Sequence, residues 1–329
     1  MTVTDTPTDQ DFEGVIAPYR RELLAHCYRM LGSVHDAEDL VQETFLRAWR
    51  SYHQFEGRSS MRTWLYRIAT NVCLTALDTR NRRPMPTGLG NPGSQAGEPL
   101  VESNEVPWLE PVPDSAVGLD ATDPASIVTS RESVRLALIA ALQHLPPRQR
   151  AVLILRDVLA WKAAEVAELL DTSTAAVNSS LQRARAQLEQ VSPSQDEVTE
   201  PTSAETTALL ERYVAAFERK DIAAMIDLFT KDAVWEMPPF LSWYQGPENI
   251  ARLVDTQCPA KGPGDMRLIP TSANGQPAFG LYMRGEDGVH RAFNLPVLTV
   301  TAEGVSHVAS FFDLSLFETF GLPLELPMS

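Results

Sequence analysis

Residues 36–49 read DAEDLVQETFLRAW, and this stretch decides the fold of the first part of the chain. Its apolar residues recur at three- and four-residue steps, which is typical of an amphipathic helix. They are Leu40, Val41, Phe45, Ala48 and Trp49. The same spacing predicts a helix before it, ending at Gly32, and another after it, from about Ser60 to Arg80. The first block is therefore predicted to be helical throughout.

The predicted helix over 60–80 is basic. Six Arg lie between Arg58 and Arg83, against Asp78 alone, and the aromatic residues Trp64 and Tyr66 are interleaved with them. Cations neutralise phosphates and aromatic rings stack on unpaired bases, so this mixture favours single-stranded or melting DNA. Trp64 itself lies on the apolar stripe and is predicted to be core.

A second helical block covers residues 131–191. Periodicity predicts helices over 132–142, 147–158, 162–170 and 174–189, and only three residues, 171–173, separate the last two. Two short helices with such a break are typical of a helix-turn-helix, whose second helix enters the major groove of DNA.

The third block, residues 205–329, changes character. Two predicted helices, 206–220 and 222–229, precede strand-like runs at 233–237, 267–273, 277–284, 291–301 and 304–312. The predicted architecture is an α+β domain with a curved antiparallel sheet around a helix-lined pocket.

Two linkers divide these blocks. Residues 84–130 hold seven acidic residues, no Lys or Arg, and many Pro and Gly, which predicts an extended or disordered acidic linker. Residues 192–204 form a shorter one. The net charge of the whole chain is −15, but block 12–83 sums to +3 and block 205–329 to −7. The charges of the first and third blocks are therefore complementary.

Composition excludes several classes of protein. Three cysteines without a CxxC pair indicate reduced thiols rather than a disulfide framework or a zinc site. We expect no metal and no cofactor. The first ten residues lack a signal-peptide pattern, and no apolar run approaches the ~18 residues of a membrane span. A cytoplasmic protein with no membrane partner is expected.

Three stretches, 36–49, 55–71 (FEGRSSMRTWLYRIATN) and 145–188 (LPPRQRAVL to RARAQL), closely resemble the extracytoplasmic-function sigma factors of bacterial RNA polymerase. The resemblance covers about 12–190, with the motifs in the family's order and spacing. It implies two helical domains, region two over 12–83 and region four over 131–191, joined by a flexible linker. It also implies core RNA polymerase as partner, through its β′ clamp helices and its β flap. The residues facing the clamp helices would be Asp36, Asp39, Gln42 and Glu43.

Promoter DNA is the second partner that the resemblance implies. Region two would meet the −10 element through Arg58, Arg62, Tyr66, Arg67, Thr70 and Asn71, with the loop from His53 to Arg58 holding a flipped base. The recognition helix would present Ser173, Thr174, Asn178, Ser179, Gln182, Arg183 and Arg185. Asn and Gln suit bidentate contacts to adenine, whereas the two Arg more often hold phosphates. Many family members carry a Lys-Ser-Arg-like run where this chain has Asn178-Ser179-Ser180, so promoter sequence does not carry over.

The third block resembles the SnoaL-like domains that some of these sigma factors carry, through residues 231–250 (KDAVWEMPPFLSWYQGPENI). Related enzymes use a carboxylate in an apolar cone as a general base. The candidates for such a role are Asp232, Glu236, His290, His307 and Asp313, and each also has an ordinary structural role open to it. A small-molecule ligand in this pocket remains open. Trp235, Met237, Trp243 and Tyr244 either line a pocket or bury against a neighbouring domain.

The function expected from these observations is a sigma factor, without catalytic activity, regulated by its own C-terminal domain at 205–329. The predicted regulatory contacts are Trp243, Tyr244, Phe317 and Phe320. Two alternatives are a one-component DNA-binding regulator that senses a ligand and a fused SnoaL-like cyclase or isomerase. The basic, aromatic helix beside an acidic one argues against both, since neither needs it. Promoter, inducing signal and oligomeric state stay open.

Overall fold

The structure is a computed structural model that describes residues 9–55, 57, 59–93, 97–119, 131–191 and 203–327. Its contacts divide the chain into two compact units. The helical unit combines 1–83 with 114–192, and the α+β unit combines 84–113 with 193–329. The sequence blocks and the units therefore differ at the first linker, which is shared between them.

The first block of the helical unit is built on α2 (Arg20–Leu31), α3 (Val34–Ser51) and α4 (Met61–Leu77), preceded by α1 (Asp9–Ile16) and a 3₁₀ turn, η1 (Ala17–Tyr19). Gly32 ends α2 in the left-handed conformation (φ 71°), as its lack of a side chain allows. Ser33 and Ser60 begin α3 and α4, each accepting a hydrogen bond from a backbone N–H of the first turn. A 3₁₀ turn, η2 (Tyr52–Gln54), follows α3. The predicted helices are confirmed, although Ala17–Tyr19 interrupts the first one.

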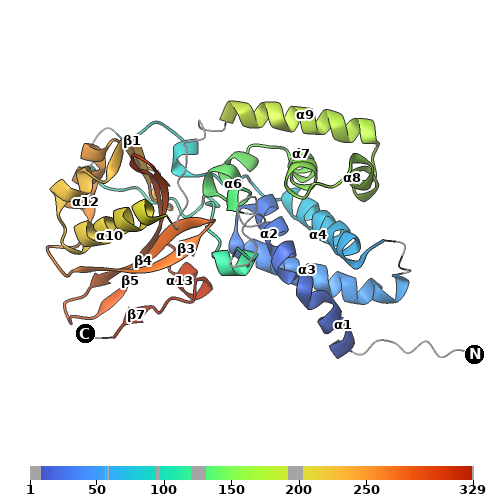
Figure 1. Cartoon of the computed structure of the whole chain (residues 1–329), viewed down its shortest axis with the longest axis horizontal. Coiled ribbons are helices and arrows are strands. Elements are labelled where there is room, and N and C mark those ends of the chain that lie inside the picture. Colours follow the sequence, from blue (N-terminus) through green and yellow to red (C-terminus); the bar gives the residue numbers. More distant parts are fainter. Residues whose placement is uncertain are drawn as a thin grey trace, which may run out of the picture. The chain divides into compact units, whose positions relative to one another are not determined.

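The second block contains α6 (Leu136–Leu142), α7 (Pro147–Leu153), a π-helical turn η5 (Ile154–Val158), α8 (Ala163–Leu169) and α9 (Thr174–Val191) (Figure 1). Val166 on α8 and Val177, Leu181 and Ala184 on α9 are buried, which holds the two helices together. The predicted helix-turn-helix is present at the predicted place.

Buried arginines join the two blocks within this unit. Arg29 on α2 donates to the backbone oxygen of Ser133 at 3.1 Å and to its hydroxyl at 2.7 Å. Arg150 on α7 donates to the carbonyl of Met30 and to Oε1 of Gln143. Burial lowers the pKa of both guanidinium groups to about 10, but both stay charged at neutral pH. Charged donors at these positions need their acceptors, so the two blocks are held in one geometry.

The α+β unit is a seven-stranded sheet with helices on its inner face. The strands are β1 (Phe229–Glu236), β2 (Trp243–Gln245), β3 (Met266–Ala273), β4 (Gln276–Arg284), β5 (His290–Thr301), β6 (Gly304–Phe311) and β7 (Glu325–Leu326). Their order is β2-β1-β6-β5-β4-β3, with β7 beside β5. The pair β1–β6 is parallel and the others are antiparallel. The expectation of a purely antiparallel sheet is therefore wrong at one pair, because β1 reaches β6 across the sheet rather than through a hairpin.

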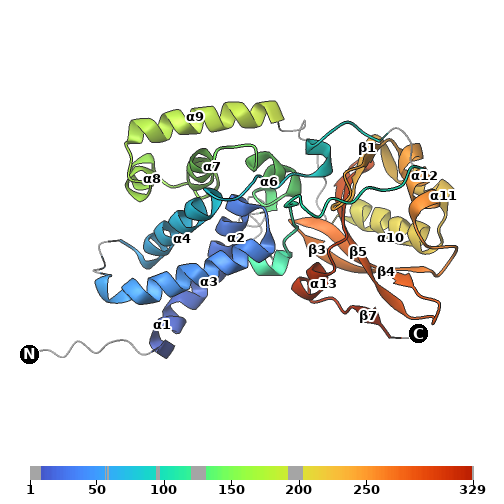
Figure 2. The same ribbon diagram turned by 180° about the vertical axis from the view of Figure 1, so that it is seen from behind.

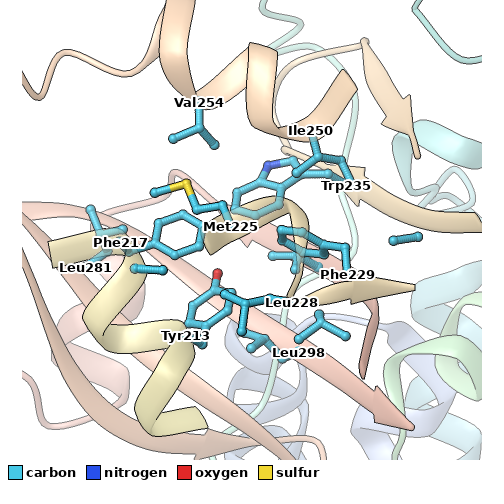
Figure 3. Close-up of a cluster of buried hydrophobic side chains, with 14 of the residues drawn as sticks. Tyr213, Phe217, Met225, Leu228, Phe229, Trp235, Ile250, Val254, Leu281 and Leu298 are labelled. Carbon is cyan, nitrogen blue, oxygen red and sulfur yellow. The ribbon is translucent and has the colours of Figure 1, made fainter. Parts of the chain in front are cut away.

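Helices α10 (Ala204–Glu218), α11 (Ile222–Ile226) and α12 (Pro247–Gln257) supply the inner core. Figure 3 shows Tyr213 and Phe217 of α10 packed with Met225 of α11 and with Trp235 of β1. The rings of Phe217 and Trp235 stack with their centroids 6.0 Å apart. Helix α13 (Ser315–Thr319) packs on the outer face of the sheet. The ring centroids of its Phe317 and of Tyr282 on β4 are 5.4 Å apart.

Residues 84–113 belong to the α+β unit, and we call them the linker arm; the described parts, 84–93 and 97–113, pack against the rest of that unit. Gly93 N donates to the carbonyl of Trp243 at 2.8 Å, and Asn274 N donates to the carbonyl of Val112 at 3.0 Å. Leu109 and Val112 are fully buried. Figure 2 shows the arm as a teal trace that runs beside β1 and reaches α12. The arm begins with a 3₁₀ turn, η3 (Pro86–Gly88), and a further one, η4 (Asp114–Val117), follows it in the helical unit.

The expectation of a flexible linker over 84–130 does not hold for the linker arm. Its acidic and breaker-rich composition has no helical or strand period, but several of its backbone groups pair with the α+β unit. Its apolar residues Met85, Leu109 and Val112 are buried, whereas Leu89 and Val101 stay exposed. Residues 120–130 and 192–202 of the two predicted linkers lie outside the described residues.

Candidate nucleic-acid interface

The outward face of α3 carries a stripe of exposed side chains. Asp39, Gln42 and Leu46 are exposed at three- and four-residue steps, and Glu43 between them is partly buried. Glu43 accepts a hydrogen bond from Nε of Arg47 at 2.6 Å. Leu46 is 51% exposed, which is unusual for a leucine beside three polar residues. The sequence-based prediction did not include Leu46, although its place outside the apolar stripe of this helix indicated an exposed side chain.

Asp36 differs from the other three residues predicted to face the polymerase. Its carboxylate pairs with Arg80 at 2.6 Å and with Arg83 at 2.5 Å, and its side chain is only 18% exposed. The residue therefore ties the start of α3 to the chain beyond α4. Its role in the structure is internal to the helical unit.

The predicted −10 residues of α4 differ in exposure. Asn71 and Arg67 are exposed, Arg62 is half-buried, and Tyr66 and Thr70 are fully buried. Arg58 lies outside the described residues. The five described residues therefore lie on one helix, α4, but the side chains of Tyr66 and Thr70 are not accessible on its surface.

Glu22 of α2 organises the half-buried part of this set. Its carboxylate accepts from Nε of Arg62 at 2.7 Å and from the hydroxyl of Tyr66 at 3.1 Å. The guanidinium of Arg62 lies 4.9 Å from the centre of the Tyr66 ring, a cation–π distance. Burial, with Glu22 adding to it, raises the pKa of Tyr66, so its hydroxyl stays protonated.

Thr70 bonds inward, to His26. The Nε2 atom of His26 lies 2.9 Å from the hydroxyl of Thr70, and both residues are buried. Burial, together with the nearby Arg29 and Arg62, lowers the pKa of His26 to about 3. The ring is therefore neutral under ordinary conditions.

The second block covers this part of α4. The Trp161 ring, 7% exposed, lies 5.5 Å from the Tyr66 ring, and Nη2 of Arg67 donates to the carbonyl of Glu168 at 2.9 Å. That carbonyl belongs to the last turn of α8, the negative end of the helix dipole, where a cation is favoured. Trp161 was not singled out from the sequence, and its position between two helices of one motif gave no sign of this contact.

All seven predicted residues of the recognition helix and its approach are exposed. They are Ser173, Thr174, Asn178, Ser179, Gln182, Arg183 and Arg185. Arg185 makes a bidentate pair with Asp157, at 2.9 and 2.7 Å, and this pair raises its pKa further. Arg185 therefore also braces α9 against the π-helical turn.

The five acid–base candidates of the α+β unit do not form a catalytic group. Asp232 is exposed, Asp313 accepts from the backbone and hydroxyl of Ser315, and the His290 ring lies 2.9 Å from the carbonyl of Gly264. Glu236 is 2% exposed and lies 2.8 Å from Nε2 of His307, and it accepts the N–H of Thr87 at 3.0 Å. Strand register puts Glu236 and His307 on the outer face of the sheet, away from the apolar core.

Most of the four residues predicted to make regulatory contacts are buried or hydrogen-bonded within the α+β unit. Tyr244 and Phe317 are buried in its core, and Phe320 is partly buried. The indole of Trp243 donates to the carbonyl of Gly90 in the linker arm at 3.0 Å. A regulatory contact through these four residues stays a prediction, and Trp243 and Phe320 are the members with exposed surface.

Comparison with known proteins identifies the helical unit and the α+β unit. Residues 15–83 match the family model of sigma-70 region 2, residues 135–188 match sigma-70 region 4, and residues 210–314 match a SnoaL-like domain. The ECF RNA polymerase sigma factor SigG of Mycobacterium tuberculosis is 61% identical over 321 residues, covering 96% of this chain and 86% of SigG. This chain belongs to the ECF RNA polymerase sigma factors. Sigma factors bind core RNA polymerase and promoter DNA and are not enzymes.

A second relative carries the same arrangement of domains. The ECF sigma factor SigJ of M. tuberculosis is 29% identical over 321 residues, covering 93% of this chain and 92% of SigJ. Its crystal structure superposes with a TM-score of 0.62 at 26% identity and covers 94% of this chain and 99% of SigJ. The predicted ECF sigma family, with two helical sigma domains and a C-terminal SnoaL-like domain, is confirmed.

Within the described parts of the chain, no helix is both long and apolar enough to span a membrane. The same parts contain no cluster of three or more His, Cys, Asp or Glu side chains placed to hold a metal ion.

Proposed function

We propose that this ECF sigma factor contacts core RNA polymerase through the α3 stripe, defined as Asp39, Gln42, Glu43 and Leu46. Three polar side chains around one exposed apolar side chain form the kind of surface that a partner helix covers. An apolar anchor among polar neighbours commonly carries much of the binding energy of an interface. Asp36 is left out of this surface because it is paired with Arg80 and Arg83.

Promoter reading is assigned to two helices. In α9, the side chains of Asn178 and Gln182 are exposed one turn apart, so both can face the same groove and bond to base edges. In α4, Arg62, Tyr66, Arg67, Thr70 and Asn71 are the −10 residues. Their counterpart Arg58 belongs to the same proposal.

The arrangement of the helical unit is proposed to be a closed state of the free protein. The observation that carries this proposal is that region four, through Trp161 and Glu168, occupies the residues of α4 that would meet the −10 element. DNA and region four would then compete for the same side chains. Opening must break the contacts of Arg29 and Arg150 as well, and core polymerase is proposed to supply the compensating contacts.

Transcription tests the main proposal directly. Purified core polymerase, the full-length protein and a genomic library of promoters should give run-off transcripts from a discrete promoter set. Substitution of the α3 stripe, as in Gln42→Ala with Leu46→Ala, should remove these transcripts while the protein stays folded. Failure of the wild-type protein to support any promoter-dependent transcript would overturn the proposal.

Opening can be measured separately by fluorescence energy transfer. Arg50→Cys on α3 and Glu189→Cys on α9 place exposed labelling sites on the two blocks, and Cys27 and Cys73 are buried. With Cys258→Ser removing the partly buried thiol, energy transfer should fall when core polymerase is added. An unchanged signal in a transcriptionally active complex would contradict the closed state.

Regulation is proposed to act through the α+β unit and its linker arm. The arm connects the two sigma regions, so its attachment to the α+β unit shortens the chain that is free to span between them. A small molecule bound to this unit is part of the same proposal. Two buried polar atoms without a hydrogen-bond partner among the described residues, Nε1 of Trp235 and Oδ1 of Asn294, support it.

A further inference from the structure

The recognition helix α9 carries two exposed arginines whose partners differ. Nε of Arg185 donates to Oδ2 of Asp157 at 2.9 Å, and Nη2 of Arg185 donates to Oδ1 at 2.7 Å. Arg183 forms no ion pair and no side-chain hydrogen bond with any described residue. Arg183 therefore presents a net positive charge to its surroundings, whereas Arg185 and Asp157 together present none.

The carboxylate of Asp157 is held in place by the backbone around it. Asp157 lies in the π-helical turn η5, where Ile154 and Leu155 are fully buried. Leu159 N donates to the carbonyl of Ile154 at 3.0 Å, which is the hydrogen bond that defines a π turn. Figure 1 shows α9 lying across α7, the helix that η5 continues. The turn thus presents a fixed carboxylate to α9.

Arg185 is placed where a DNA phosphate would come within its reach. Asn178 and Arg185 point in directions about 20° apart around α9, and Arg185 lies roughly 10 Å further along the helix axis. The N-terminal part of a recognition helix contacts base edges in the major groove, which is about 12 Å wide. A side chain that far beyond Asn178 therefore reaches the sugar-phosphate strand that borders the groove. The side chain of Arg185 is 56% exposed, so a phosphate can approach it.

The carboxylate of Asp157 and a phosphate compete for the same guanidinium group. Arginine forms two parallel hydrogen bonds with either anion. A cation adds to DNA affinity by neutralising a phosphate and releasing counterions, and a pair with no net charge does this poorly. The exposed pair of Arg185 and Asp157 is weak, since such pairs change an equilibrium by no more than about five-fold. It is nevertheless strong enough to reduce the share of Arg185 in DNA binding.

We propose that Asp157 is a positioning residue that holds Arg185 away from DNA phosphates and thereby keeps the sequence-independent DNA affinity of α9 low. The base contacts of Asn178 and Gln182 then supply a larger share of the binding energy. A genome offers roughly 10⁶–10⁹ competing sites, so a low sequence-independent affinity leaves more of the protein free to bind core polymerase. The inference rests on the proposed promoter reading by α9 and deepens it.

The test measures binding of the full-length protein to a short fluorescent DNA duplex of randomised sequence. Asp157→Asn keeps the size of the side chain but loses the charge that holds Arg185. This variant should bind the duplex about two- to five-fold more tightly than the wild type at about 50 mM salt. One additional phosphate contact makes binding more sensitive to salt, so most of this gain should disappear by about 200 mM.

The direction of the change separates this role from a purely structural one. If the pair only braced α9, Asp157→Asn would loosen the recognition helix and bind DNA equally or more weakly. Asp157→Glu keeps a carboxylate beside Arg185 and should bind the duplex as the wild type does. Equal or weaker binding by Asp157→Asn, or a gain that does not depend on salt, would overturn the proposal.

Asp171→Asn is the matched control, because it removes the same charge beside the same helix. Asp171 is exposed, lies in the turn before α9 and forms no ion pair with a described residue. Its φ of 50° is one that asparagine also adopts. Asp171→Asn should therefore change the affinity much less than Asp157→Asn does. Equal gains from the two variants would show a general effect of charge and overturn the proposal.

Sequencing of the bound duplexes separates this inference from the proposed promoter reading. Asn178→Ala should change the preferred bases, whereas Asp157→Asn should raise the affinity and leave the preferred bases unchanged. If Asn178→Ala changes no base preference while Asp157→Asn binds more tightly, the promoter reading fails and the role of Asp157 stands. The opposite pattern removes only the role of Asp157. A changed base preference in Asp157→Asn would show that Arg185 reads bases, and would overturn the proposed phosphate contact.

Discussion

The ring of Trp161 lies 5.5 Å from the ring of Tyr66, so a residue of region four covers a residue of α4 that is predicted to meet promoter DNA. Trp161→Ala should expose Tyr66 and loosen the closed state. Free Trp161→Ala protein is expected to bind a short fluorescent single-stranded oligonucleotide of randomised sequence more tightly than the wild type. Trp161→Phe keeps a ring against Tyr66 and serves as the matched control. Equal oligonucleotide affinity for all three proteins would contradict the closed state.

Two aspartates one turn apart on α3 should behave in opposite ways. Asp36→Ala removes the partner of Arg80 and Arg83 and should lower the free energy of unfolding by about 1–3 kcal/mol, with little effect on polymerase affinity. Asp39→Ala should leave stability unchanged and weaken core polymerase binding by about 1–2 kcal/mol. Urea unfolding and a polymerase binding titration on each variant provide the check. If Asp36→Ala mainly weakens polymerase binding, the α3 stripe is wrongly drawn.

Base preference and general affinity should separate along α9. Asn178→Ala or Gln182→Ala should change which upstream bases are preferred, at about 1–3 kcal/mol for each lost bidentate contact. Arg183→Ala should weaken binding to all sequences and reduce the salt dependence of binding by about one counterion. Arg185→Ala is a useful comparison because it also breaks the pair with Asp157. The same base profile from Gln182→Ala and Arg183→Ala would disprove this assignment of the helix.

His26 should make the helical unit sensitive to acid. Its folded pKa is about 3 and its unfolded pKa is about 6.5, so between these values the unfolded chain holds the additional proton. The contribution of His26 to the free energy of unfolding is complete above pH 6.5. Below that pH, the free energy of unfolding falls by about 1.4 kcal/mol per pH unit until the folded pKa is reached. Between pH 7 and pH 5, the wild type should lose about 2 kcal/mol more than His26→Gln, which keeps a side chain able to bond Thr70. Equal losses in urea unfolding at the two pH values would show that His26 is not buried in this way.

The linker arm should be protected from hydrogen exchange in the free protein. The amides of Gly93, Ser103 and Asn274 form hydrogen bonds between the arm and the rest of the α+β unit, so each should exchange far more slowly than in an unfolded chain. Glu236→Ala removes the acceptor for the Thr87 amide and should free the start of the arm while leaving the Asn274 amide protected. Exchange at unfolded-chain rates throughout 97–113 in the wild type would contradict the docked arm.

Local patterns were enough to predict the helical unit. The three- and four-residue spacing of Val177 and Leu181 found the buried face of α9, and the short break at 171–173 found the turn before it. These signals are local because a helix places residues three and four apart on one side. The exposed recognition residues follow from the same periodicity.

Long-range pairings could not be predicted in this way. Asp36 sits on the same face of α3 as Asp39, and only the return of the chain at Arg80 and Arg83 distinguishes them. The linker arm has no period at all, and its partners such as Trp243 and Asn274 lie more than 100 residues further along the chain. The parallel pairing of β1 with β6 likewise depends on how the sheet closes, which strand composition does not record.

The division of the α+β unit between 84–113 and 193–329 has a consequence for synthesis of the chain on the ribosome. The arm leaves the ribosome before the sheet to which it binds, and about 90 residues separate its end from α10. At 5–20 residues per second, Leu109 and Val112 stay without their binding surface for at least several seconds. Once residue 191 has been synthesised, both sigma regions are complete while the arm is still an exposed segment between them. The nascent chain is therefore expected to pass through a form in which the linker arm is free. This form ends only when the last strands of the sheet have folded and bind the arm.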